Sequence, residues 1–183
     1  MRQVLLISGS TRAGSTNTAV LRTAASLTDP DVTTELYAGL SDLPAFNPDD
    51  DHDPLPAPVA HLRARIAAAD AVLFCTPEYA GSLPGSFKNL LDWTVGGTEM
   101  NAKPTAWINV ASIAAPTGGA GAHTELATVL GYVTADVVTA ACARAPMSRA
   151  SVGPDGLVVD PAVRWQITQT LRLLAAVPSH AVG

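Results

Sequence analysis

The stretch VLLISGSTRAGSTN, from Val4 to Asn17, decides the fold of this chain. Its first part, Val4–Ser8, is a short run of β-formers that predicts a buried strand, and a polar loop rich in glycine and serine follows. Helical spacing begins directly after the loop, with Val20, Ala24 and Leu27 on one face. A buried strand, a short loop and an amphipathic helix form the first half of a βαβ unit. We therefore expect an α/β fold built around a parallel sheet.

The same alternation of apolar run and helical segment continues through the chain. It predicts one domain over residues 1–183, with five parallel strands and helices on both faces of the sheet. The predicted strands are Val4–Ser8, Val32–Tyr37, Ala71–Thr76, Thr105–Ala111 and Val133–Ala141. Further helical faces are Leu62, Ile66 and Ala69; Phe87, Leu90 and Leu91, in a helix that starts near Pro84 and stops at Gly96–Gly97; Leu126, Val129 and Leu130; and Val163, Ile167 and Leu174.

Composition limits the classes of function. The chain has 183 residues, of which 48% are apolar and 15% charged, and its net charge is −5. Such an acidic chain offers no basic surface to a phosphate backbone, so we expect no nucleic-acid partner. No apolar run approaches the ~20 residues of a membrane span, and none resembles a secretory leader. We expect no membrane association and a cytoplasmic location.

Several reactive side chains form no recognisable site. Cys75 and Cys142 lie in or beside apolar runs, where a free cysteine packs as a small apolar residue. The acidic cluster within Asp42–Pro58 lacks the ligand spacing of a calcium loop, and we interpret it as solvated surface. No serine has the surroundings of a hydrolase nucleophile. Metal-ligand spacing is also missing around the histidines, which are His52, His61, His123 and His180, so we expect no metal site.

The polar loop Gly9–Asn17 is the first candidate binding site. A helix N-terminus exposes unpaired N–H groups and the positive end of the helix dipole, so the loop can bind a phosphate. The alternative is that Ser15 or Thr16 only caps the helix. The loop lacks both the lysine of a P-loop and the G-x-G-x-x-G of a dinucleotide site. What remains is a monophosphate held by hydroxyls, an amide and the Arg12 guanidinium.

Two further loops follow predicted strands. The second, TPEYAGSLPGSFKNLLDW at Thr76–Trp93, can face the same ligand, because ligands of open α/β sheets bind at the carboxyl ends of the strands. In it, Tyr79 offers a flat ring to an aromatic ligand, although it could instead cover core. The third loop, Ser112–Gly121, has glycine amides that can donate to a heterocycle, unless the loop is only a turn.

Taken together, the motifs at Gly9–Asn17 and Thr76–Trp93 resemble the NADPH-dependent FMN reductase family. The similarity extends to DLPAFNPD at Asp42–Asp49, TGG at Thr117–Gly119 and the DG…DP run at Asp155–Pro161. The resemblance implies a flavodoxin-like three-layer sandwich with FMN at the carboxyl edge of the sheet. It also implies hydride transfer from NADPH or NADH through bound FMN to a flavin, quinone, azo dye or metal ion, in a homodimer or homotetramer.

The resemblance assigns roles to individual residues. The first loop would hold the FMN phosphate, the second would line the isoalloxazine, and the third would close its far side. Lys88, Asn89 and Asp92 would belong to a helix used for packing and subunit contact. No side chain is needed as an acid or a base, since the cofactor carries the chemistry. The residues expected to bind cofactor are Ser10, Arg12, Ser15, Thr16, Asn17, Pro77, Glu78, Tyr79, Ala80, Gly81, Ser82, Ser112, Thr117, Gly118 and Gly119.

Two features depart from the family pattern. Ala80 stands where many relatives have asparagine, which removes a polar side chain beside the flavin. The third loop has Ala114, Ala115 and Pro116 where relatives tend to be rich in glycine. These differences bear on acceptor preference and on the contacts of the third loop.

Two other functions are compatible with an FMN site. A flavodoxin-like electron carrier would be more acidic and would place aromatic rings around the flavin, whereas this chain has a net charge of −5 and 5% aromatic residues. We therefore favour the enzyme over the carrier. A flavin-bound protein that binds a partner and turns over little is not excluded by the sequence.

Overall fold

The computed structural model describes residues 1–112 and 115–178. The described strands form one parallel sheet in the order β2-β1-β3-β4-β5, with β6 also paired to β4. The strands are β1 (Arg2–Ser8), β2 (Val32–Tyr37), β3 (Ala71–Thr76), β4 (Pro104–Ala111), β5 (Asp136–Val137) and β6 (Ala143–Pro146). The α-helices are α1 (Thr16–Ser26), α2 (Ala57–Ala68), α3 (Gly85–Asp92), α4 (Ala120–Tyr132) and α5 (Pro161–Ala176).

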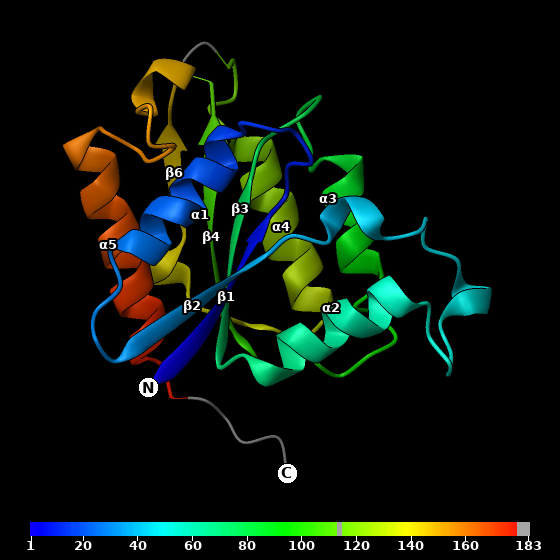
Figure 1. The fold of residues 1–183 in the computed structure, drawn as a ribbon. Helices are drawn as coiled ribbons and strands as arrows, with labels where there is room; N and C mark the ends of the chain where they lie inside the picture. Colours follow the sequence, from blue (N-terminus) through cyan, green and yellow to red (C-terminus); the bar gives the residue numbers. More distant parts are fainter. Residues whose placement is uncertain (113–114, 179–183) are drawn as a thin grey trace.

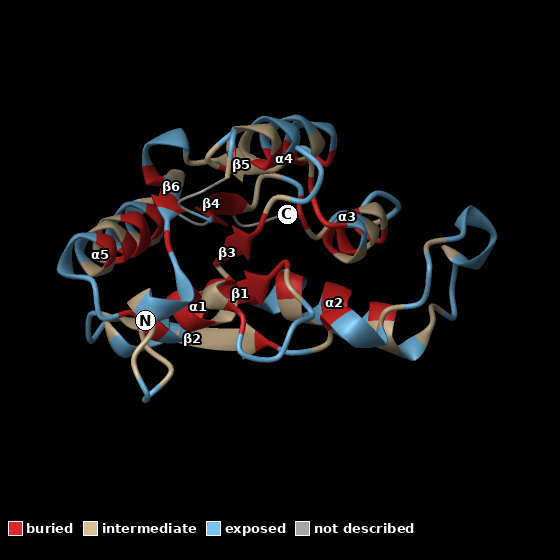
Figure 2. Ribbon diagram, turned by 90° about the horizontal axis from the view of Figure 1, so that it is seen from above, coloured by how far each residue is buried: buried red, intermediate tan, exposed pale blue. Residues whose placement is uncertain are grey.

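Helices cover both faces of this sheet (Figure 1). On one face, α1 and α5 pack through residues such as Leu21 and Ile167, and on the other α2, α3 and α4 pack through residues such as Leu62 and Phe87. Seen from above, the buried residues gather on the strands and on the helix sides that face them (Figure 2). The strand order 2-1-3-4-5 is that of the flavodoxin-like sandwich, which confirms the predicted fold class.

The central strands β3 and β4 could be predicted from their apolar runs alone. Every residue of β3 and of β4 is buried, because helices cover both sides of the middle of a parallel sheet. The bounds predicted for β2 and β3 agree with the structure residue for residue. The predicted helix faces are also confirmed, except that Leu27 and Ala69 are the C-caps of α1 and α2, and Leu27 and Val129 are only half-buried. The helix near Pro84 ends at Asp92, four residues before the glycine pair expected to stop it.

The prediction of a fifth strand over Val133–Ala141 is wrong in its position. Val133 is the C-cap of α4, and only Asp136–Val137 pairs as β5, opposite Pro104 and Thr105. A 3₁₀ turn, Thr139–Ala141, then interrupts the strand before β6 pairs with Ile108–Ala111. This strand position lies at the edge of the sheet, where pairing with one neighbour tolerates a break, and β6 contains no β-branched or aromatic residue, so its sequence has a weak β preference.

Residues 43–56, between β2 and α2, form a segment that we call the strap. Hydrogen bonds hold it against α3. The side chain of Asn89 accepts a hydrogen bond from the Phe46 amide at 2.7 Å and donates to the Pro44 carbonyl at 2.9 Å. The Trp93 indole N–H also donates to the Pro44 carbonyl, at 2.9 Å. Asn89 on α3 therefore fastens a segment of its own chain. The apolar residues Phe87, Leu90 and Leu91 of that helix are fully buried within the chain, so they present no exposed face to a second copy.

The acidic cluster of the strap differs in part from the solvated loop expected. Asp49, Asp50, His52 and Asp53 are exposed. Asp51 instead forms a 2.6 Å ion pair with Arg63 of α2, and each side chain is only about a tenth exposed. Arg63 Nε also donates to the Trp93 carbonyl at 2.9 Å. One member of the cluster is thus a mostly buried anchor between the strap and α2.

Neither cysteine is placed to act as a thiolate. Cys75 is fully buried in β3, and burial raises the pKa of its thiol. Burial also raises the pKa of the half-buried Cys142 thiol to about 11. Within residues 1–112 and 115–178, no three side chains of histidine, cysteine, aspartate or glutamate gather as a metal site, and no helix is long and apolar enough to cross a bilayer. His180 lies outside the described residues.

Candidate cofactor-binding site

The polar loop after β1 is built around the start of α1. The Gly9 amide donates to the Cys75 carbonyl at 2.8 Å, which continues the pairing of β1 with β3, and the chain then turns through Gly14 at φ +67°. Ser15 is the N-cap of α1 and accepts from the Asn17 amide at 3.2 Å. The capping role that was the alternative for this loop is therefore real. Capping uses only one residue of the loop, so it does not account for the other polar groups there.

The loop presents donors and a positive charge at this helix end. The first turn of α1 contains no acidic residue, so its N–H groups and dipole are not neutralised locally. Asn17 is almost fully buried, and its Oδ1 accepts from the Cys75 thiol at 3.4 Å, which leaves its side-chain Nδ2 as a donor. Arg12 is exposed, and no carboxylate in the described part of the chain pairs with it.

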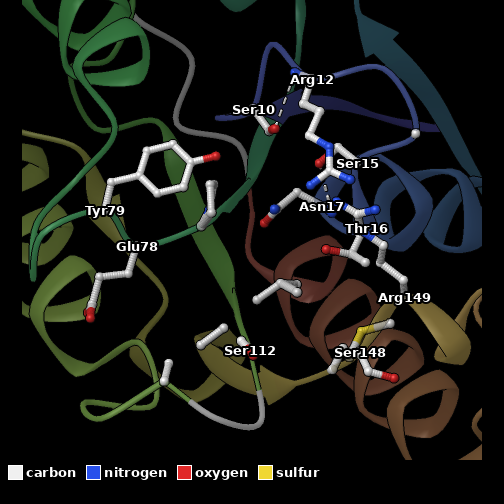
Figure 3. A pocket seen from close by; sticks show the side chains of 16 residues that line it. Ser10, Arg12, Ser15, Thr16, Asn17, Glu78, Tyr79, Ser112, Ser148 and Arg149 are labelled. Carbon is white, nitrogen blue, oxygen red and sulfur yellow. Dashed lines mark hydrogen bonds between the residues drawn. The ribbon is translucent and has the colours of Figure 1, made fainter.

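The second loop forms a tight hairpin. Tyr79 and Ser82 exchange two backbone hydrogen bonds of 3.0 Å, and between them Ala80 and Gly81 adopt φ of +52° and +75°. Two successive left-handed residues are the geometry of a two-residue hairpin turn, which favours asparagine and glycine. Tyr79 is 57% exposed, and its ring extends toward the cavity (Figure 3). Of the two predicted alternatives for Tyr79, the structure therefore excludes burial in the core.

Glu78 does not point into the cavity. Its carboxylate points away from it, toward the start of α4 (Figure 3), where it accepts from the Ala122 amide at 2.9 Å and from the Thr117 hydroxyl. The hydrogen bond from Thr117, helped by the Ala122 and Gly121 amides, lowers the pKa of Glu78 below its usual value. Because the N-cap of α4, Gly119, has no side chain to cap the helix, Glu78 supplies an anion there from the neighbouring loop.

A second carboxylate, on α4 itself, also joins α4 to the hairpin. Glu125 of α4 accepts from the Ser82 hydroxyl and, at 3.2 Å, from the Leu83 amide. The two elements are also in direct contact, because a Cβ added at Gly121 would lie 1.9 Å from the Gly81 carbonyl oxygen. The hairpin and α4 are thus joined by two carboxylates and a glycine contact. Sequence reasoning missed Glu125, which lies inside a helix and outside every motif.

The third loop begins with Ser112 at the end of β4 and leads into α4. Residues 113 and 114, and with them the expectation for Ala114, lie outside the described residues. Gly118 and Gly119 take φ of +57° and +85°, which only glycine adopts without strain. They let the chain turn into α4 above Asn109 and Ala111, the nearest neighbours of a Cβ built on Gly119.

These loops enclose a cavity of about 390 Å³ at the carboxyl edge of the sheet (Figure 3). A volume of this size is typical of a small-molecule site. Nine of the predicted residues line it: Ser10, Arg12, Ser15, Thr16, Asn17, Pro77, Glu78, Tyr79 and Ser112. The other six predicted residues do not line it and instead shape the surrounding loops: Ala80, Gly81, Ser82, Thr117, Gly118 and Gly119. The remaining lining residues are Gly14, Val110, Ala111, Ala115, Met147, Ser148 and Arg149.

Sequence reasoning missed the wall formed by residues 147–149. These residues directly follow β6, so they lie at a strand end like the other three loops. A correct position for the last strand would have identified these residues from the sequence. Had that strand been placed at residues 143–146, the same rule for strand ends would have pointed to Ser148 and Arg149.

Known proteins share both the sequence pattern and this arrangement. The family model for NADPH-dependent FMN reductase matches residues 2–147. An NAD(P)H-dependent FMN reductase of Pseudomonas aeruginosa is 43% identical over 106 residues, which are 57% of each chain. A quinone reductase of Escherichia coli K12 is 36% identical over 92 residues, 50% of this chain and 49% of that protein. The chain spans about half the length of the curated relatives it matches.

Among solved structures, the match extends over nearly the whole chain. The flavoenzyme NAD(P)H:(acceptor) oxidoreductase FerB of Paracoccus denitrificans superposes with a TM-score of 0.81 at 28% identity. The superposition covers 95% of this chain and 96% of FerB. An NADH:FMN oxidoreductase, EMOB, superposes with a TM-score of 0.70 at 18% identity, which shows the shared fold.

Proposed function

Because the chain belongs to the NADPH-dependent FMN reductase family, we propose that it binds FMN in the strand-end cavity and reduces a small molecule with electrons from NADPH or NADH. The observation that carries this proposal is the cavity itself, which joins a phosphate-type helix end to a loop with an exposed aromatic ring. When bound, FMN supplies the hydride chemistry, and the protein supplies binding and orientation.

The donor set fits a flavin monophosphate. For the phosphate we propose the hydroxyls of Ser10, Ser15 and Thr16, the Asn17 amide and the Arg12 guanidinium, together with the amides of the first turn of α1. For the ring system we propose contacts with Pro77, Tyr79 and Ser112. Both sets open into the same cavity, so a single elongated molecule can reach from one to the other.

The remaining predicted residues act on the shape of the site in this proposal. Glu78 and Ser82 are bound to α4, so they fix the hairpin that carries Tyr79. Ala80, Gly81, Gly118 and Gly119 supply the left-handed conformations of the two loops, and Thr117 holds Glu78. These residues would pre-organise the binding site, which lowers the entropy lost when a ligand binds.

The described side chains that line the cavity offer few groups for general acid or base catalysis, and of the usual ones only the exposed Tyr79 phenol extends toward the cavity. Among its described lining residues there is no histidine, lysine or cysteine, and the single carboxylate, Glu78, faces α4. The chain would therefore act by aligning the electron donor with the bound cofactor and by limiting access of water.

One experiment separates this function from its alternatives. The purified protein is reconstituted with FMN and mixed anaerobically with NADPH and, separately, with NADH, while the visible flavin absorbance is followed. We expect rapid bleaching by at least one nucleotide and recovery of colour when a quinone is added. Bound FMN that neither nucleotide bleaches would favour the electron carrier or the partner-binding protein, and absence of FMN binding would exclude all three.

We also propose that the protein is a homodimer or homotetramer in the cytoplasm. Tyr132 of α4 and Trp165 of α5, 85% and 66% exposed, lie on helices that cover opposite faces of the sheet, so they form no single apolar patch and the proposal rests on the family to which the chain belongs. Multi-angle light scattering of the purified protein tests the oligomer directly, and a monomer at micromolar concentration would contradict it.

A further inference from the structure

The cavity wall after β6 carries an arginine that the family motifs do not explain. Arg149 is the first residue of a 3₁₀ turn, Arg149–Ser151, and lies just beyond residue 147, where the family match ends. It lines the same cavity as Arg12. Figure 3 shows both side chains extending toward the start of α1, near Ser15 and Thr16. Two guanidinium groups from distant parts of the sequence therefore line one cavity, and both extend toward the start of α1.

The charge at this place is not balanced by the protein. In residues 1–112 and 115–178, the ion pairs involve Arg63, Arg65, Lys88 and Arg172, and neither Arg12 nor Arg149 takes part in one. Among the described lining residues, the only carboxylate is that of Glu78, and it is turned toward the amides of α4. A chain with a net charge of −5 thus keeps two unpaired positive charges in one cavity, which predicts an anionic ligand there.

The turn that carries Arg149 is fastened to the rest of the site. The Met147 amide donates to the Ala111 carbonyl at 2.9 Å, which extends the pairing of β6 with β4. Farther along, Val152 and Val158 form a bridge, and the Val158 amide donates to the buried Thr23 hydroxyl of α1 at 2.9 Å. The same helix carries the polar loop at its N-terminus, so the two arginines are held on connected elements.

We propose that Arg149 binds the 5′-phosphate of FMN together with Arg12, an inference that rests on the proposed function. A phosphate monoester carries a charge of about −1.5 to −2 at neutral pH, so two guanidinium groups match its charge. Each guanidinium also offers parallel N–H donors that fit the phosphate oxygens. The place of Arg149 near the start of α1, away from Tyr79, assigns it to the cofactor phosphate and not to the second nucleotide.

The test compares FMN with riboflavin, which lacks the phosphate. Arg149→Ala, Arg149→Lys and the wild type are titrated with both ligands by quenching of flavin fluorescence, and Tm is measured for each. The control is Arg22→Ala, which removes the same charge from an exposed position on α1 that does not line the cavity. We expect Arg149→Ala to weaken FMN binding about 10- to 100-fold, the range for a hydrogen bond to a charged group, with riboflavin binding and Tm unchanged. Arg149→Lys should lose less FMN affinity than Arg149→Ala, because lysine keeps the positive charge but lacks the parallel N–H donors of the guanidinium.

Three results would overturn the assignment. Unchanged FMN affinity in Arg149→Ala would place the residue outside the cofactor contacts. Equal losses for FMN and riboflavin would make its role structural. A change confined to the KM for NADPH relative to NADH would assign Arg149 to the second nucleotide. Failure of the proposed function is a separate result, because the wild type would then bind neither flavin, or would bind FMN that neither NADPH nor NADH bleaches.

Discussion

At the scale of single residues, the site shows how one side chain can serve structure while its neighbours remain available for a ligand. Ser15 accepts from the Asn17 amide as the cap of α1 and keeps its hydroxyl hydrogen to donate, and Asn17 accepts from Cys75 through Oδ1 and keeps Nδ2 as a donor. Arg12 has no such internal partner in the described chain. The residues that look alike in the motif therefore differ in how free they are to bind.

Arg12→Ala tests the phosphate contact. We expect FMN affinity to fall by about 1.5–3 kcal/mol, because a hydrogen bond to a charged group is lost in the complex. Arg12 is exposed and unpaired, so the unfolding free energy should not change. Isothermal titration with FMN measures the effect, and an unchanged Kd would show that Arg12 lies away from the ligand.

Ala80 is strained in the hairpin turn. Its φ of +52° lies in the left-handed region, where an L-residue with a Cβ is disfavoured and asparagine is tolerated better. We expect Ala80→Asn to raise the unfolding free energy by about 0.5–1 kcal/mol in urea titrations.

Ala102 provides the matched control for this substitution. It has φ +51° and does not line the cavity, so Ala102→Asn should give a similar gain in stability with no change in FMN affinity. A loss of stability in Ala80→Asn would contradict the role given to the turn geometry.

At the scale of elements, the three loops and the wall after β6 are positioned by the ends of strands and the starts of helices. β3 could be predicted with correct bounds because it is a continuous apolar run, and β2 because β-branched and aromatic residues stand between turn residues. The fifth strand could not, because β5 has only two residues, a 3₁₀ turn follows it, and β6 contains no β-branched residue. Because this strand was misplaced, Ser148 and Arg149 were not recognised as residues at a strand end. Glu125 was hidden for another reason: its role depends on contact between a loop and a helix that periodicity does not reveal.

The link between the hairpin and α4 predicts a pH dependence. Hydrogen bonds in the folded state lower the pKa of Glu78, so its stabilising contribution is fully present above the usual value of 4.5 and is lost as the pH falls through the lower folded pKa. We expect Glu78→Gln to be less stable than the wild type at neutral pH. The difference between the two unfolding free energies should shrink on acidification below that value. Urea titrations across this range measure it, and a difference that does not vary with pH would contradict the ionic role of Glu78.

At the scale of the whole molecule, an acidic protein surrounds a cavity that bears unpaired positive charge. The sheet places four strand ends on one edge, and the arginines come from two of them, at residues 12 and 149. Fold class and three of the four cavity walls followed from the sequence, because the loops after the predicted strands of a parallel sheet lie at one edge. The strap could not be predicted, since Asn89 and Trp93 hold it by hydrogen bonds to the Pro44 carbonyl, which is distant in sequence.

The Asp51–Arg63 ion pair is the charged anchor of this strap. Arg63→Ala leaves a mostly buried carboxylate without a partner, and we expect it to cost about 3–5 kcal/mol of unfolding free energy. The matched control is Arg172→Ala, whose ion pair with Asp29 is more than half exposed and should contribute about 0–1 kcal/mol. Chemical denaturation compares the two variants, and similar small losses in both would show that the strap is not held by this pair.

The central claim is that the strand-end cavity holds one FMN by its phosphate. Titration of the wild-type protein with FMN and with riboflavin, followed by flavin fluorescence, tests it most directly. We predict saturation at one FMN per chain and an affinity at least about 10-fold higher for FMN than for riboflavin, the difference made by charged hydrogen bonds to the phosphate. Equal affinities for the two flavins, or no saturable binding of FMN, would contradict the claim.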